Sequence, residues 1–282
     1  MPVLENEFIS VVLEAKGAEI QNLVSKQDQT EYIWQGDLKY WPWHAPICFP
    51  IVGKLANDKY YVRNNSYSLP IHGFARDMEF TEIEVSNSQI MYCLDYDKTT
   101  LARFPFKFKL VIKYSLLGNG VDIQYIVKNT DDKQIYFSLG AHPGFNCPFS
   151  SEEMFSDYEL IFDKIEHCLA EDLEELRLQN GNTLKLEHKL FQKGALVFEN
   201  LQSQFVILKS RKTGKSITVR FENFPYLGIW TKADEAPFIC IEPWFGIADR
   251  SEESKQISQK EGILSLQPCQ EFKCAYQILI AN

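Results

Sequence analysis

The strongest constraint on the fold of this chain is a hydrophobic alternation of period two that recurs along much of its length. Between residues 106 and 114 every second residue is aromatic or aliphatic, and lysines occupy three of the four positions between them. Side chains of a strand point alternately to its two faces, so this pattern predicts a strand with one buried face. Gly118-Asn119-Gly120 follows and the alternation resumes over 121–127, which predicts a hairpin.

Similar strand patterns occur along most of the chain, whereas helical periodicity is scarce. The predicted helical pieces are Thr99–Phe104 and Leu173–Leu178, each a turn or two long. No linker rich in glycine, serine or proline divides the sequence, so we expect residues 1–282 to form a single domain. The expected fold class is all-β, a large antiparallel β-sandwich with few short helices. The further predicted strands are residues 7–14, 18–24, 78–85, 89–96, 134–139, 157–163, 204–210, 217–221, 227–231 and 272–280.

The composition narrows the class of protein. The chain has 282 residues, 45% of them hydrophobic, which is enough for a substantial core. A formal net charge of −9 argues against nucleic acid or an anionic membrane as the main partner. The first residues lack the basic and apolar regions of a signal peptide, and no apolar run reaches the roughly 20 residues of a transmembrane helix. Seven dispersed cysteines without a C-x-x-C pair indicate free thiols, so we expect a soluble protein of the reducing cytoplasm.

One further apolar strand, Phe238–Gly246, presents a single carboxylate, Glu242, beside Trp244. An apolar, aromatic setting disfavours the charged carboxylate and can raise its pKa towards that of a working acid or base. A tryptophan beside a carboxylate also suits a sugar, which has an apolar ring face to stack and hydroxyls to bind. The alternative is a strand-end glutamate that caps a turn or forms a salt bridge.

His142 lies in a motif that restricts its direction. It follows a predicted strand and Gly140-Ala141, and it precedes Pro143-Gly144, so the imidazole projects from the sheet with little backbone freedom. Histidine changes charge near neutral pH and can therefore donate or accept a proton. The alternative is a turn histidine that is satisfied by the backbone.

His72 lies in a second motif of this kind. It precedes Gly73, which permits close backbone approach, and Arg76 follows with a planar donor for hydroxyls or a phosphate. The alternative is that Arg76 pairs with Asp77 or Glu79 and that His72 caps a turn.

Other kinds of site have no sequence signal. No paired Cys/His set or H-x-x-E-H spacing predicts a metal centre, and neither a glycine-rich phosphate loop nor a G-x-S-x-G motif occurs. What remains is a histidine, a glutamate and aromatic residues, which is the minimal set for proton transfer on a sugar.

Five short motifs occur in order along most of the chain: Phe49–Lys54, His72–Arg76, Gly140–Phe145, Tyr226–Trp230 and Cys240–Gly246. Together they resemble the aldose 1-epimerase (galactose mutarotase-like) family, especially its LacX-like bacterial branch. The resemblance implies a large β-supersandwich with the sugar bound in an open cleft on one sheet, in agreement with the strand pattern.

The family chemistry is mutarotation, the interconversion of the α and β anomers of an aldose through its open-chain form. By resemblance, Glu242 is the base on the C1 hydroxyl and His142, as imidazolium, the acid at the ring oxygen. His72 would position the ring oxygen or a neighbouring hydroxyl. No cofactor is implied, because the net oxidation state does not change. The candidate substrate-binding residues are His72, Arg76, Lys54, Trp230 and Trp244.

Two departures from the family pattern affect the substrate. Lys54 stands where family members commonly have an arginine for sugar hydroxyls. Many members also have a sugar-binding aspartate between the acid and the base, and the matching region Lys189–Gly194 contains no acid. Whether Gln192 or Lys193 replaces that aspartate is open, so galactose should not be assumed.

Three other functions remain open at this point. The first is a hexose-6-phosphate mutarotase in which Lys54 and Arg76 bind the phosphate. The second is a sugar-binding or regulatory protein that keeps the cleft without turnover. The third is a glycosidase, which needs two carboxylates; Asp249 is the nearest companion of Glu242 in sequence but is typical of a turn. The expected partner is a small sugar, and a homodimer is left open.

Overall fold

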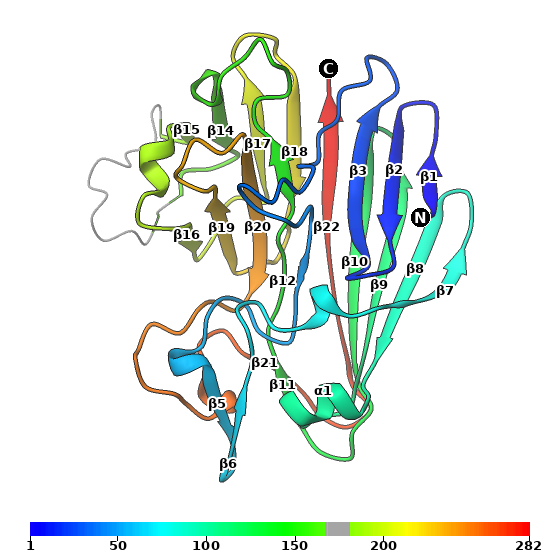
Figure 1. Cartoon of the computed structure of the whole chain (residues 1–282), viewed down its shortest axis with the longest axis vertical. Coiled ribbons are helices and arrows are strands. Elements are labelled where there is room, and N and C mark those ends of the chain that lie inside the picture. The colour runs from blue at the N-terminus through cyan, green and yellow to red at the C-terminus, as the bar shows by residue number, and fades with distance from the viewer. Residues whose placement is uncertain (167, 169–180) are drawn as a thin grey trace.

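The computed structural model describes residues 1–166, 168 and 181–282. Its largest sheet has nine antiparallel strands in the order β15-β14-β17-β18-β22-β10-β9-β8-β7 (Figure 1). The predicted hairpin is confirmed, because Leu117 pairs with Gly120 at its closed end. The bounds are β7 Thr81–Val85, β8 Gln89–Asp95, β9 Phe108–Leu117, β10 Gly120–Asn129, β14 Tyr158–Phe162, β15 Thr183–Lys185, β17 Phe205–Ser210, β18 Ser216–Arg220 and β22 Glu271–Ala281.

A six-stranded sheet and a three-stranded sheet cover one face of this large sheet (Figure 1). The six-stranded sheet has the order β16-β19-β20-β12-β4, and β13 also pairs with β20. The segment after β3 joins the two smaller sheets, because Glu31 forms a bridge with Val24 of β3 and Ile33 forms one with Phe145 of β13. The bounds are β1 Val3–Glu5, β2 Ile9–Glu14, β3 Glu19–Ser25, β4 Ile47–Cys48, β12 Leu139–Ala141, β13 Gly144–Asn146, β16 Leu196–Glu199, β19 Tyr226–Trp230 and β20 Phe238–Phe245.

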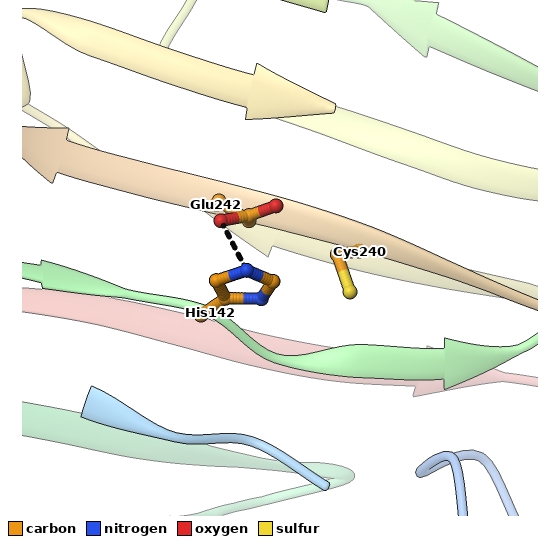
Figure 2. A group of neighbouring side chains, drawn as sticks. All are labelled: His142, Cys240 and Glu242. Carbon is orange, nitrogen blue, oxygen red and sulfur yellow. Dashed lines mark ion pairs between the residues drawn. The ribbon is translucent and has the colours of Figure 1, made fainter. Parts of the chain in front are cut away.

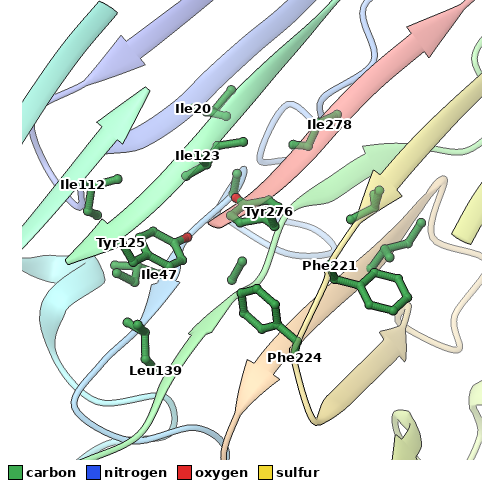
Figure 3. Close-up of a cluster of buried hydrophobic side chains, with 14 of the residues drawn as sticks. Ile20, Ile47, Ile112, Ile123, Tyr125, Leu139, Phe221, Phe224, Tyr276 and Ile278 are labelled. Atoms are coloured by element: carbon green, nitrogen blue, oxygen red, sulfur yellow. The ribbon is translucent and has the colours of Figure 1, made fainter. Parts of the chain in front are cut away.

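The main core lies between these layers. Figure 3 shows Ile123 of β10 and Ile278 of β22 in one buried cluster with Ile20 of β3 and Leu139 of β12. Each of these side chains is at most 1% exposed. The apolar face predicted from period-two alternation is thus the face that the smaller sheets cover, and the all-β sandwich is confirmed.

The remaining elements are short. Helix α1, Lys98–Arg103, confirms the predicted piece at 99–104, and Asp97 caps it by accepting a hydrogen bond from the backbone of Thr100. The other predicted piece, Leu173–Leu178, lies outside the described residues. No helix among the described residues has the length and apolarity to cross a bilayer. The minor strands and 3₁₀ turns are β5 Lys59–Val62, β6 Asn65–Ser68, β11 Ile135–Phe137, β21 Leu264–Leu266, η1 Ala56–Asp58, η2 Ala75–Asp77, η3 Phe155–Asp157, η4 His188–Phe191 and η5 Ile257–Gln259.

Candidate active site

Strand register places His142 beside Glu242. Gly140 of β12 pairs with Trp244, and Gly144 of β13 pairs with Cys240, so both short strands follow one antiparallel register along β20. His142 lies midway between the two glycines and therefore falls opposite Glu242. Paired positions of a sheet direct their side chains to the same face. The pairing of strands thus brings together two residues that are 100 positions apart.

These side chains line a cavity of about 430 Å³ on the outer face of the six-stranded sheet. Six of the seven predicted site residues are in its lining, whereas Lys54 is an exposed residue outside it. The backbone carbonyl of Lys54 accepts a hydrogen bond from Asp249, at 2.9 Å. The lining consists of Trp41, Trp43, Ile71, His72, Arg76, His142, Ala195, Trp230, Glu242 and Trp244.

His142 and Glu242 form a buried acid–base pair. The Nε2 atom of His142 lies 3.1 Å from Oε2 of Glu242, and the two side chains are 7% and 1% exposed (Figure 2). Burial raises the pKa of Glu242 well above its usual range, and burial, together with the nearby His72, lowers the pKa of His142. Both shifts disfavour the charged form of the residue, and two groups this close titrate as a coupled pair.

Cys240 is the third member of this cluster (Figure 2). It precedes Glu242 by two residues on β20 and so lies on the same face, and donor atoms of Cys240, His142 and Glu242 lie within 4.8 Å of one another. Sequence spacing gives no indication of this cluster, because strand pairing creates it. A metal is bound by the thiolate, whereas burial raises the pKa of Cys240 and keeps its sulfur protonated.

His72 supplies a neutral hydrogen-bond donor. Its Nδ1 accepts the backbone N–H of Gly53 at 3.2 Å and lies 3.1 Å from the thiol sulfur of Cys48. Because Nδ1 is an acceptor, the ring proton is on Nε2. Burial and the charge of Arg76 lower the pKa of His72 to about 3, so the ring stays uncharged. The His72 and His142 rings meet edge to face with centroids 5.0 Å apart.

Arg76 is held against the cavity wall. Its Nη2 donates to the carbonyl of Ile71 at 3.0 Å, and its guanidinium carbon lies 4.2 Å from the ring centre of Trp43. The alternative pairing with Asp77 is loose, since Nε and Oδ2 are 3.9 Å apart. Arg76 is therefore anchored by a carbonyl and an aromatic face, which leaves Nε without a hydrogen-bond partner among the described residues.

Aromatic rings form the floor and one side of the cavity. The indole of Trp244 lies across Gly140 and Gly228, and a Cβ at either glycine would collide with it. Trp41 stacks on His142 at 4.9 Å, and Trp230 meets the same ring edge to face at 5.9 Å. Trp41 and Trp43 were missed by sequence reasoning, because they lie in an irregular proline-containing segment without strand alternation. The cluster of tryptophans in 41–43 is the signal that could have indicated them.

Several buried polar atoms of the lining have no hydrogen-bond partner among the described residues. They are Arg76 Nε, His142 Nδ1, Glu242 Oε2 and Trp244 Nε1. The contact between His142 and Glu242 is close, yet its alignment is poor for a hydrogen bond. Buried polar groups normally have partners, and this unpaired set of donors and acceptors is what a polyhydroxyl ligand can satisfy.

Comparison with known proteins extends these findings. The aldose 1-epimerase family model matches residues 3–262. The chain is 33% identical to the chromosomal protein LacX of Lactococcus lactis subsp. lactis, with 99% of each chain aligned. A galactose mutarotase-like protein from Lactobacillus casei is similar over the full length of both chains, with a TM-score of 0.91 and 32% identity. A galactose mutarotase related enzyme from Lactobacillus acidophilus has a TM-score of 0.92 and 31% identity, covering 100% of this chain and 97% of the other.

Proposed function

The chain belongs to the aldose 1-epimerase family, and from this premise we propose that it is a mutarotase that interconverts the anomers of a free aldohexose. The observation that supports this most is the buried pair of His142 and Glu242, which lies in a cavity with an aromatic floor and neutral hydrogen-bond donors. We assign the base to Glu242 and the acid to His142. The sugar ring would lie against Trp244, with His72 and Arg76 donating to its oxygens.

In the proposed reaction the carboxylate of Glu242 accepts one proton from the sugar, and the imidazolium of His142 donates one proton to the sugar. Glu242 takes the proton of the C1 hydroxyl as the C1–O5 bond breaks, and the electron pair of that bond goes to O5. His142 protonates O5, and C1 becomes an aldehyde carbon. Rotation about C1–C2 followed by the reverse transfers gives the other anomer. General acid and base catalysis contribute roughly 10²–10⁴-fold in such steps.

The scheme starts from the charged state of the pair, which burial disfavours in the free protein. Before ring opening the pair is carboxylate and imidazolium, and afterwards it is carboxylic acid and imidazole, with the same total of one proton. Burial favours the uncharged form of each residue, so the uncharged state of the open-chain stage is stabilised. The C1 hydroxyl that donates to Glu242 would stabilise the charged state on sugar binding.

A hexose-6-phosphate mutarotase has less support. Lys54 is outside the cavity lining, and Arg76 already donates to Ile71 and stacks on Trp43. A phosphate would need cations beside it, and of the two cationic residues named for it only Arg76 lines the cavity.

The direct test is polarimetry of freshly dissolved α-glucose, α-galactose and α-glucose 6-phosphate. We expect catalysed relaxation to the equilibrium rotation for at least one neutral hexose, and slower catalysis for the phosphate. A folded protein that binds a hexose without accelerating relaxation would instead be the non-catalytic sugar-binding protein.

The dependence of kcat/KM on pH tests the one-proton pair. Activity is lost at low pH when the pair gains a second proton, and the lowered pKa of His142 moves that loss below the ordinary imidazole value of 6.5. Activity is lost at high pH when the shared proton leaves, and the raised pKa of Glu242 moves that loss upward from the ordinary carboxyl value. We therefore expect the low-pH loss to be centred below pH 6.5, on the acid side of the plateau. An inflection centred at pH 6.5 would contradict the pairing.

A further inference from the structure

Two tryptophans of the catalytic cavity come from a segment without regular structure. Residues 34–46 form neither helix nor strand, yet Trp41 and Trp43 of this segment line the cavity. Trp41 stacks on the ring of His142, and Trp43 holds the guanidinium of Arg76 against its face. A segment without a strand ladder must obtain its backbone hydrogen bonds elsewhere, and those bonds decide where its side chains lie.

A buried carboxyl group, that of Glu19, supplies part of this anchoring. Glu19 is the first residue of β3 and is 8% exposed. Its Oε1 accepts the backbone N–H groups of His44 and Ala45, each at 2.8 Å, and its Oε2 accepts from Gln21 Nε2 at 3.2 Å. Burial raises the pKa of Glu19, and a protonated and an ionised carboxyl group can both accept these bonds. The anchor therefore needs an oxygen in this place and does not need a charge.

The anchored residues also hold the backbone of the strands that carry His142. The carbonyl of His44 accepts from the N–H of Gly144 at 2.8 Å, and the carbonyl of Pro46 accepts from the N–H of His142 at 3.0 Å. Hydrogen bonds thus run from Glu19 through His44 to Gly144, two residues after His142. Glu19 is outside the cavity lining, so it can influence the site only through this segment.

We propose that Glu19 is a positioning residue of the catalytic site, which keeps Trp41 and Trp43 in place by binding two backbone N–H groups of their segment. Trp41 in turn restricts the ring of His142, and Trp43 restricts the guanidinium of Arg76. The consequence for catalysis rests on the proposed function, whereas the placement of the two tryptophans does not. A merely structural glutamate would change the amount of folded protein but not the geometry of the site.

Three substitutions of Glu19 separate the reach of its side chain from its charge. Glu19→Gln keeps an oxygen at the same reach without the charge, whereas Glu19→Asp keeps the charge and draws the oxygens back by one methylene. Glu19→Ala removes the acceptor and leaves two buried N–H groups unpaired. The matched control is Glu166→Ala, outside the cavity lining. Glu166 is 6% exposed, and its Oε1 likewise accepts two successive backbone N–H groups, those of Gln202 and Ser203.

Tryptophan emission and sugar kinetics report the position of the segment. All five tryptophans of the chain line this cavity or, in the case of Trp34, donate a hydrogen bond to Trp41. We expect Glu19→Ala and Glu19→Asp to shift the emission maximum to longer wavelength. In polarimetry with glucose and galactose, both should lower kcat/KM by about 10–100-fold, with KM at least about threefold higher. Glu19→Gln keeps the acceptor and should stay within about threefold of wild type, with unshifted emission, as should Glu166→Ala.

The outcomes decide the proposal. Wild-type emission and kcat/KM in folded Glu19→Ala, an equal loss in Glu166→Ala, or a loss in Glu19→Gln but not in Glu19→Asp would overturn it. If Glu19→Ala does not fold, the opposite responses of the glutamine and aspartate variants still carry the test. If wild type relaxes no sugar, the proposed reaction is overturned, while emission and calorimetric binding of the same hexoses still decide the role of Glu19. Circular dichroism and thermal melting show which variants are folded.

Discussion

Replacing Glu242 by glutamine is expected to lower kcat for anomer interconversion by about 10²–10⁴-fold without unfolding the protein. The amide has the shape of the carboxyl group but cannot take the proton of the C1 hydroxyl. Glu242 is 1% exposed and its pKa is raised by burial. The stability that a raised carboxyl pKa contributes is present at low pH and lost as pH rises through the folded-state value. At neutral pH the uncharged glutamine should therefore not lower the melting temperature.

The measurement is relaxation of optical rotation at saturating sugar, together with a thermal melt of the same sample. Glu271→Gln makes the identical chemical change on β22 of the other sheet, where the side chain is about half exposed, and should leave kcat unchanged. If Glu242→Gln retained more than about a tenth of wild-type kcat, Glu242 would not be the base. A parallel fall in the Glu271 variant would point to loss of folded protein rather than of chemistry.

The sequence predicts which side chains of β20 share a face, but it does not predict which residue of another strand lies beside Glu242. Cys240, Glu242 and Trp244 are two residues apart, so strand alternation alone places them on one face. The partner of Glu242 depends on how β12 and β13 pair with β20, and pairing between segments 100 residues apart has no local signal. The motif order indicated that His142 belongs with Glu242, and the register gives the physical reason.

The sequence was less informative where strands are short. Strands β4, β12 and β13 have two or three residues each, too few for an alternating pattern, yet they position His142. The Lys54 prediction shows a related limit. A motif places the backbone correctly, as Gly53 and its hydrogen bond to His72 show, but it does not fix the direction of the neighbouring side chain. Lys54 is exposed, and its role as a sugar ligand stays a prediction.

Cys240 and Trp41 illustrate two different reasons for a missed site residue. Cys240 lies within an apolar strand pattern and is fully buried, as a small hydrophobic residue of the core would be. Its two-residue spacing from Glu242 was the available signal. Trp41 comes from a loop that packs across the sheet and stacks on His142. Only the tertiary structure shows that contact, because loops carry no periodicity from which a direction can be inferred.

Replacing His142 by asparagine is expected to lower kcat by a similar factor, about 10²–10⁴-fold, because the amide cannot donate a proton to the ring oxygen. The double variant Glu242→Gln/His142→Asn should fall less than about tenfold below either single variant. The pair functions with one shared proton, so removing either member disables both, and the effects of such residues are strongly non-additive. The matched control is His188→Asn, since His188 stacks on Phe155 outside the cavity.

The pH dependence of the residual activity in the two single variants shows whether His142 itself transfers a proton or only positions Glu242. In His142→Asn the remaining carboxyl keeps a pKa raised by burial, so residual kcat/KM should increase with pH as Glu242 becomes ionised. In Glu242→Gln the remaining imidazole is neutral over the same range, because burial lowers its pKa, and residual activity should be flat. If the single losses multiply in the double variant, or if His142→Asn keeps the wild-type plateau, the two residues act independently and the shared-proton mechanism is wrong.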